Sequence, residues 1–193
     1  MGIMTLGPAY GLQLHSELCG RAPHRARTNV GQIYATLERL VAAGTAQKSG
    51  ATIDGFPLYS LTDKGQTQAQ SWLVGETVMS FSEWSEILDH IMIARSLSDS
   101  ALERVIGVYE RILTRDPMQP ALPANIGQTM ADLAQQHIIN AALAWLGDIR
   151  RDLSRRLTRA EDPATDSRGA ECDDDVARGY RAHRPKRGRP ALA

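Results

Sequence analysis

One stretch decides how this chain folds: Thr28-Asn29-Val30-Gly31-Gln32-Ile33-Tyr34-Ala35-Thr36-Leu37-Glu38-Arg39-Leu40. Its apolar residues recur every three or four positions, the period of an α-helix that buries one face. Thr28 or Asn29 suits the start of that helix, because a short polar side chain there accepts a hydrogen bond from a free backbone N–H. Gly44 suits its end, because glycine tolerates a positive φ. The predicted buried face consists of Val30, Ile33, Leu37, Leu40 and Val41.

The opposite face of the same helix carries Gln32, Thr36 and Arg39. Their spacing of four and three residues lines them up along one exposed side. A single helix fits the major groove of B-DNA, where Gln pairs with adenine and Arg pairs with guanine or with phosphate. The pattern therefore predicts a face that reads base edges. The alternative is an ordinary amphipathic helix whose polar residues only face water.

A hairpin is predicted directly after this helix. Candidate strands run from Ala46 to Thr52 and from Leu58 to Leu61, and Asp54-Gly55 between them is a strong turn signal. Thr62 is then suited to cap a further helix, which we expect to run to Glu76. A helix followed by a two-stranded hairpin is the pattern of a winged helix.

Three motifs in order make the first third of the chain resemble PadR-family transcriptional regulators. They are Gly7-Pro8-Ala9-Tyr10-Gly11, Asn29-Val30-Gly31-Gln32-Ile33-Tyr34 and Tyr59-Ser60-Leu61-Thr62-Asp63-Lys64-Gly65. The resemblance implies a mainly α fold with a small two-stranded β wing. A winged helix-turn-helix domain over residues 1–76 would be followed by a helical dimerisation or effector segment over residues 77–158.

Two departures from the family pattern affect this expectation. Only Met1 to Leu6 precede the Gly-Pro motif, so the first helix is predicted to be truncated. The wing carries Gly55-Phe56-Pro57-Leu58 where relatives often have an Arg-Pro-Arg-Lys-like stretch. The contact between the wing and DNA is therefore less secure than that of the helix.

The resemblance implies a sequence-specific DNA-binding transcriptional regulator, a repressor released by a small-molecule effector. Its partners would be double-stranded DNA with a palindromic operator, a second copy in a homodimer, and a small aromatic effector. The alternative is an architectural or protein-interaction module that binds DNA loosely. The predicted base-reading residues are Gln32, Thr36 and Arg39, and the predicted phosphate or backbone contacts are Arg25, Arg27, Thr28, Asn29, Tyr34 and Lys48.

The local charge agrees with this expectation, although Arg25 and Arg27 could equally belong to a solvated basic loop. From Cys19 to Lys48 there are four Arg and one Lys against a single acid, Glu38. Over the whole chain Lys plus Arg and Asp plus Glu both total 22, so only the distribution is informative.

The middle of the chain predicts three helices with apolar faces. Two carry stripes around Ile91 and Ile106, and the third follows a proline-rich loop between Asp116 and Pro123. The stripe of the third helix is wide, which favours a dimer interface over an intrachain bundle. Trp84 and Trp145 are candidates for an effector pocket at that interface, although helical spacing already explains each of them, and Trp72, as core residues.

Residues 159–193 are predicted to form a disordered tail. Residues 161–175 hold seven acids and one Arg, whereas residues 176–193 hold six bases and no acid. Within the basic block, Arg187, Gly188 and Arg189 resemble an AT-hook, in which glycine lets the backbone enter a narrow minor groove. The alternative is a solvated basic tail. The acidic block could fold back on the basic block or compete with DNA for it.

Other classes of function find little support. We find no glycine-rich phosphate loop, no nucleophile elbow and no paired metal motif, so no catalytic residues, cofactor or metal are expected. His15, Cys19 and His24 do not complete a ligand set. Two cysteines do not form a disulfide framework, and neither a signal peptide nor a membrane span is visible. We therefore expect a cytoplasmic protein.

Overall fold

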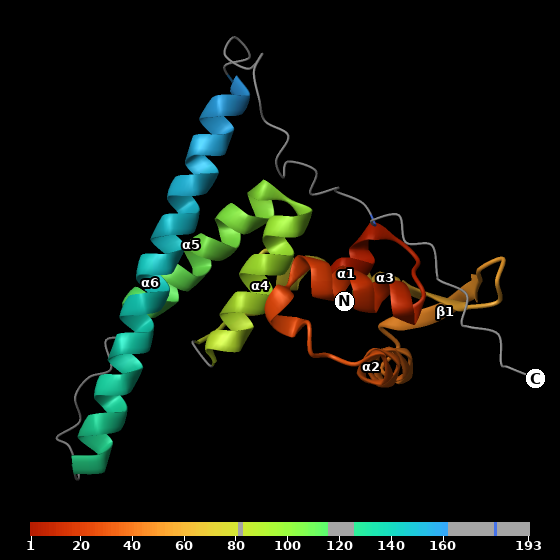
Figure 1. Cartoon of the computed structure of the whole chain (residues 1–193), viewed down its shortest axis with the longest axis horizontal. Coiled ribbons are helices and arrows are strands. Elements are labelled where there is room, and N and C mark those ends of the chain that lie inside the picture. The colour runs from red at the N-terminus through yellow and green to blue at the C-terminus, as the bar shows by residue number, and fades with distance from the viewer. Residues whose placement is uncertain (81–82, 116–125, 162–179, 181–193) are drawn as a thin grey trace, which may run out of the picture. The chain divides into compact units, whose positions relative to one another are not determined.

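The computed structural model describes residues 1–80, 83–115, 126–161 and Tyr180 (Figure 1). Its contacts divide the chain into two compact units. The first, called here the N-terminal unit, comprises residues 1–70 and includes Tyr180. The second, called the helical unit, begins at Ser71, and its described part ends at Glu161. The boundary falls inside a helix that begins at Asp63.

The N-terminal unit has the predicted mixture of helices and one small sheet. Figure 1 shows the helices packed beside a two-stranded antiparallel sheet, and this confirms the predicted fold class. The segment before the Gly-Pro motif is a five-residue 3-10 helix. The elements are η1 Gly2–Leu6, α1 Gly11–Arg21, η2 Pro23–Arg25, α2 Val30–Ala42, β1 Ala46–Ala51, β2 Pro57–Leu61 and α3 Asp63–Leu73.

A single bridge joins a third segment of the chain to the two-stranded sheet. In β1 and β2, Ala46 pairs with Leu61 and Lys48 pairs with Tyr59, and the register shifts between Lys48 and Ala51. Ala9 forms an isolated antiparallel bridge to Tyr59, with N–O distances of 2.9 and 3.0 Å. The chain before α1 is thereby joined to the wing. Because the shift places Pro57 opposite Ala51, β1 ends and β2 begins one residue earlier than predicted.

Helix α1 buries a charged face. Its most buried side chains are Leu14, Glu17 and Arg21, whereas an apolar stripe through Leu12 and Leu18 is only half-buried. The Nε of Arg21 donates to Glu17 Oε2 at 2.8 Å, with both side chains almost fully buried. Burial of opposite charges is tolerated when they neutralise each other directly.

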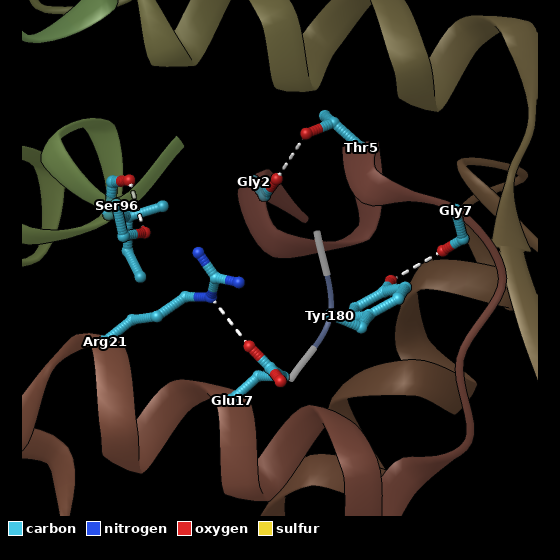
Figure 2. A network of polar contacts seen from close by, with 8 residues as sticks. Gly2, Thr5, Gly7, Glu17, Arg21, Ser96 and Tyr180 are labelled. Atoms are coloured by element: carbon cyan, nitrogen blue, oxygen red, sulfur yellow. Dashed lines mark hydrogen bonds and ion pairs between the residues drawn. The ribbon is translucent and has the colours of Figure 1, made fainter. Parts of the chain in front are cut away.

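Tyr180 belongs to the same region of the N-terminal unit. Figure 2 shows its ring between the 3-10 segment and α1, with its hydroxyl donating to the Gly7 carbonyl at 2.6 Å. Burial, and then the negative charge of Glu17, raises the pKa of the Tyr180 hydroxyl, which therefore remains a donor. A residue more than 170 positions away along the chain thus packs against the start of this unit.

Helix α3 begins as predicted and ends early. Its cap is Thr62, whose Oγ1 accepts the N–H of Gly65 at 3.2 Å and donates to the Gly44 carbonyl at 2.8 Å. Gly65 lies against the chain that leaves α2, because a Cβ there would be 1.8 Å from the Thr45 carbonyl oxygen. The helix ends at Leu73 rather than Glu76, since Gly75 adopts a φ of 82° that turns the chain.

The helical unit consists of α4 Trp84–Leu97, α5 Asp99–Arg115 and α6 Ile126–Glu161. Helix α5 contacts both of the others and is strongly amphipathic. The predicted loop between Asp116 and Pro123 lies outside the described residues. No helix of the described chain is long and apolar enough to span a bilayer. The core comprises Ile87, Ile91, Ala94, Ala101, Leu102, Val105, Ile106, Tyr109, Leu113, Ile139, Ala142, Leu146 and Leu153.

His90 is buried in this unit within an aromatic cluster. Its ring stacks on Trp72 at 4.2 Å and meets Tyr109 edge to face at 5.6 Å. Nδ1 lies 3.1 Å from the Tyr109 hydroxyl, and Nε2 contacts the Trp72 carbonyl. Because the carbonyl can only accept, Nε2 carries the proton and Nδ1 accepts from Tyr109. Burial lowers the pKa of His90 to about 4, against a smaller opposing effect of the Trp72 carbonyl.

We expect the stability of the helical unit to fall as the pH falls from about 6.5 to about 4. In that window the unfolded chain binds a proton at His90 that the folded chain excludes, so up to about 3 kcal/mol is lost. Urea unfolding followed by circular dichroism at several pH values measures this slope. His90→Gln, whose amide can still donate to a carbonyl, should show a flatter profile. An unchanged slope in this variant would assign the effect elsewhere.

Candidate nucleic-acid interface

The start of α2 is fixed by a reciprocal capping box. The Asn29 side chain accepts the backbone N–H of Gln32 at 2.9 Å, and Gln32 Oε1 accepts the backbone N–H of Asn29 at 3.0 Å. The bond to Gln32 Oε1 satisfies a donor at the start of the helix, and the bond to the Asn29 side chain adds to the contact of the Gln32 N–H with the Asn29 carbonyl at 3.1 Å. The end of α2 is equally local, because Gly44 has a φ of 68° and donates to Val41.

The two faces of α2 are divided as the sequence predicts. Leu37 is buried and the other predicted inward residues are half-buried, whereas Gln32, Thr36 and Arg39 are exposed. Arg39 lies along the helix, donating to Thr36 Oγ1 at 3.1 Å and to the Ala35 carbonyl at 3.3 Å. A guanidinium has five N–H donors, so these two hydrogen bonds leave other N–H groups of Arg39 available to a ligand.

The capping role of Gln32 competes with its predicted role in reading a base. Bidentate reading of adenine needs the carboxamide oxygen as acceptor and its NH₂ as donor. The capping box already engages that oxygen with the backbone of Asn29. Gln32 therefore offers only its NH₂ group to a base edge while the cap is intact. The Asn-x-x-Gln spacing in the sequence is the pattern that indicates the capping role of Gln32.

Lys48 on β1 is held by an acid on α2. Its Nζ lies 3.3 Å from Glu38 Oε1, with both side chains more than half exposed. The Tyr59 hydroxyl donates to the same oxygen at 3.1 Å. Burial, followed by this hydrogen bond and the charge of Glu38, raises the pKa of Tyr59. An exposed ion pair is worth little, so Lys48 can exchange Glu38 for a phosphate at small cost.

Tyr34 and Thr28 are engaged inside the unit. The Tyr34 ring lies against the first residue of α1, since a Cβ on Gly11 would be 2.5 Å from Tyr34 Cζ. The Thr28 carbonyl is 2.7 Å from His15 Nε2, which also lies 3.7 Å from Cys19 Sγ. These contacts hold α1 against the start of α2. Among the described residues no group of three or more His, Cys, Asp or Glu side chains is placed to hold a metal ion.

The basic turn and the wing tip flank this helix. Arg25 is half-buried at the end of η2, and Arg27 is exposed in the turn that follows. At the wing tip Ile53 is fully exposed, while Phe56 stacks on Tyr10 at 5.6 Å. Lys48 is the hairpin's single basic residue.

The other predicted site residues lie elsewhere. The rings of Trp84 and Trp145 meet edge to face at 5.2 Å within the helical unit, and the exposed fraction of Trp84 is 36%. The helical unit has two grooves that neither Trp84 nor Trp145 lines. One has a volume of about 850 Å³, and the other has a volume of about 460 Å³ and is bordered by Trp72 and Tyr109. The AT-hook-like residues Arg187, Gly188 and Arg189 lie outside the described residues.

Replacing Asn29 with alanine is expected to destabilise the N-terminal unit by about 1 kcal/mol. The variant removes the acceptor for the Gln32 N–H at the start of α2, and loss of such a cap has this typical cost. Thermal unfolding of the purified variant measures the change. Asn29→Ser restores an acceptor and should lie close to the wild type. Equal stability of the alanine and wild-type proteins would mean that the box does not hold α2.

These features define a winged helix-turn-helix domain, in which α1 and α2 form the helix pair and β1 and β2 the wing. No protein-family model and no curated protein matches the sequence. Among solved structures, the chain is similar to Bacillus subtilis PadR in complex with operator DNA. That similarity has a TM-score of 0.33 and 17% sequence identity, and it covers 82% of this chain and 96% of that chain. The geometry of the N-terminal unit by itself defines the winged helix-turn-helix class.

Proposed function

We propose that this chain is a sequence-specific DNA-binding transcriptional regulator that acts as a repressor. The observation that carries the proposal is the exposed face of α2, where Gln32, Thr36 and Arg39 project from a helix that is capped at both ends and packed on α1. The N-terminus of α2 adds backbone N–H groups and a positive dipole end, which favour phosphate. Arg27, and Lys48 after release from Glu38, would contact the DNA backbone.

A homodimer fits both a palindromic operator and the surface of α6. This helix has 36 residues, and four large apolar side chains are exposed among those whose burial the structure describes. A second copy would bury them, and two recognition helices about 34 Å apart would match half-sites one helical turn apart. Sedimentation of the full chain measures the oligomeric state. The exposed apolar residues of α6 are Met130, Leu133, Ile138 and Leu157.

Release by a small aromatic effector would take place in the helical unit. The Trp84 and Trp145 pair could open to admit a planar ligand, and the 460 Å³ groove beside Trp72 is a second candidate. The volume of the groove lies in the range of small-ligand pockets, and the aromatic rings of the tryptophan pair can stack on a planar ligand. Quenching of tryptophan fluorescence in Trp84→Phe and Trp72→Phe distinguishes the two positions.

The test of the proposal is the ratio of specific to non-specific affinity at one salt concentration. A regulator should bind its own upstream region at least about a thousandfold more tightly than random DNA. A ratio near one would favour the architectural alternative, which the weakly basic wing also suits. Sequencing the DNA fragments that the protein retains would identify the operator.

A further inference from the structure

The helical unit has an open groove with an unusual concentration of arginine. Its volume is about 850 Å³, and four guanidinium groups border it against two carboxylates, those of Glu76 and Glu103. Its floor includes the half-buried side chains of Val74, Val108 and Ile112. The bordering arginines are Arg104, Arg111, Arg115 and Arg150.

Three of these arginines form a line on α5. Arg104, Arg111 and Arg115 are seven and four residues apart, a spacing that places them on one helical face. All three are exposed. Within the part of the chain that the structure describes, no acidic side chain forms an ion pair with them, whereas Arg150 pairs with Glu110 at 2.6 Å. The line extends for about 16 Å at the rise of an α-helix.

The chain itself contains a segment of matching charge. Residues 161–175 hold seven acids and one Arg; the first of them, Glu161, ends α6, and the other fourteen directly follow it. Glu161 is eleven residues beyond Arg150, about 16 Å along the helix. An extended segment of the fourteen residues after α6 spans about 46 Å, so it can return to the groove and follow the line of arginines.

We propose that the groove of the helical unit binds the acidic segment, residues 161–175, of the same chain. Carboxylates on the segment pair with Arg104, Arg111 and Arg115, and its small apolar residues cover the floor. Arginine is suited to this role because its planar guanidinium binds carboxylates through two parallel hydrogen bonds. While it is bound in the groove, the acidic segment cannot pair with the basic block, residues 176–193. This interaction does not require DNA.

Cys172 lies inside the acidic segment and provides a direct test. In the full chain with Cys19→Ser, a second thiol is introduced on the groove floor by Ile112→Cys, or outside the groove by Arg95→Cys on α4. A disulfide needs Cα atoms within about 7 Å, so it forms only where the segment lies. After mild oxidation at low protein concentration, we expect a monomer-sized cross-linked product at least about tenfold more abundant for the floor position.

Charge reversal and salt complete the test. Arg111→Glu with Arg115→Glu should suppress the cross-link, as should about 1 M salt, which reduces the screening length to about 3 Å. Equal cross-linking at both thiol positions, or insensitivity to charge reversal, would overturn the proposal. A dimer-sized product would also overturn it, because the segment would then come from a second copy. None of these readouts requires DNA, so failure here leaves the proposed regulator function standing.

Discussion

Replacing Gly65 with alanine is expected to unfold the N-terminal unit at temperatures where the wild type is folded. The added Cβ would lie 1.8 Å from the Thr45 carbonyl oxygen and 3.2 Å from Thr45 Cα. That neighbour is backbone, and the same carbonyl accepts the N–H of Thr62 at 3.2 Å. Relief of the overlap must therefore move α3 away from the chain joining α2 to β1.

The expected cost is at least about 3 kcal/mol, at the upper end for overpacking. For a unit of this size that corresponds to a fall in Tm of more than about 12 °C. Trp84 and Trp145 lie on α4 and α6 of the helical unit, so fluorescence measured in a Trp72→Phe background should report an unchanged transition there, while far-UV circular dichroism reports the early loss.

Gly147→Ala provides a matched control on α6. A Cβ at this helical position meets no atom within 4 Å, so the usual preference of helices for alanine should stabilise by about 0.5–1 kcal/mol. If Gly65→Ala were neutral or stabilising as well, the close approach of α3 to Thr45 would be wrong.

Arg39→Ala should abolish most of the preference for operator over random DNA without loss of folding. One bidentate contact to a base contributes about 1–3 kcal/mol of discrimination, so the preference should fall by about ten- to a hundredfold. Arg39 is exposed, and its bonds in the free protein are made within its own helix, to Ala35 and Thr36. Stability should therefore change little. Fluorescence anisotropy with operator and scrambled duplexes measures both affinities.

Three comparison variants distinguish recognition of bases from attraction of positive charge to phosphate. Arg39→Lys keeps the positive charge but loses the planar fork, so it should resemble alanine in preference. Arg27→Ala should weaken all sequences alike and reduce the dependence on salt, as expected for a phosphate contact. Arg187→Ala should weaken binding mainly on A·T-rich flanks. Retention of operator preference by Arg39→Ala would mean that α2 does not read the sequence.

Helix α2 and the wing were predictable because local rules determine them. The helical period, the Asn29 cap and the positive φ of Gly44 bound α2 within the printed stretch. A glycine at residue 55 likewise turns the hairpin with a φ of 82°. Helix α3 was predicted too long because Trp72 continues its pattern, whereas the conformation of Gly75 ends it.

The engagement of the candidate DNA-contacting residues was less predictable. The capping role of Gln32 is local and could be read from its spacing to Asn29. The pairing of Lys48 with Glu38 joins a strand to a helix, so it depends on how β1 packs beside α2. Residue types alone predict a free cation at Lys48, because they do not specify that Tyr59 and Glu38 converge there.

By itself, the sequence determined the elements of the N-terminal unit, since capping, helical period and turn chemistry act over a few residues. Only the tertiary structure decided which groups those elements bring together. It buried the Glu17 and Arg21 pair on the face of α1 that polarity would assign to water, and it placed Tyr180 against Gly7. It also left Arg104, Arg111 and Arg115 bordering one groove. The physical reason is that burial and charge pairing depend on distances between segments remote in the chain, which no local pattern encodes.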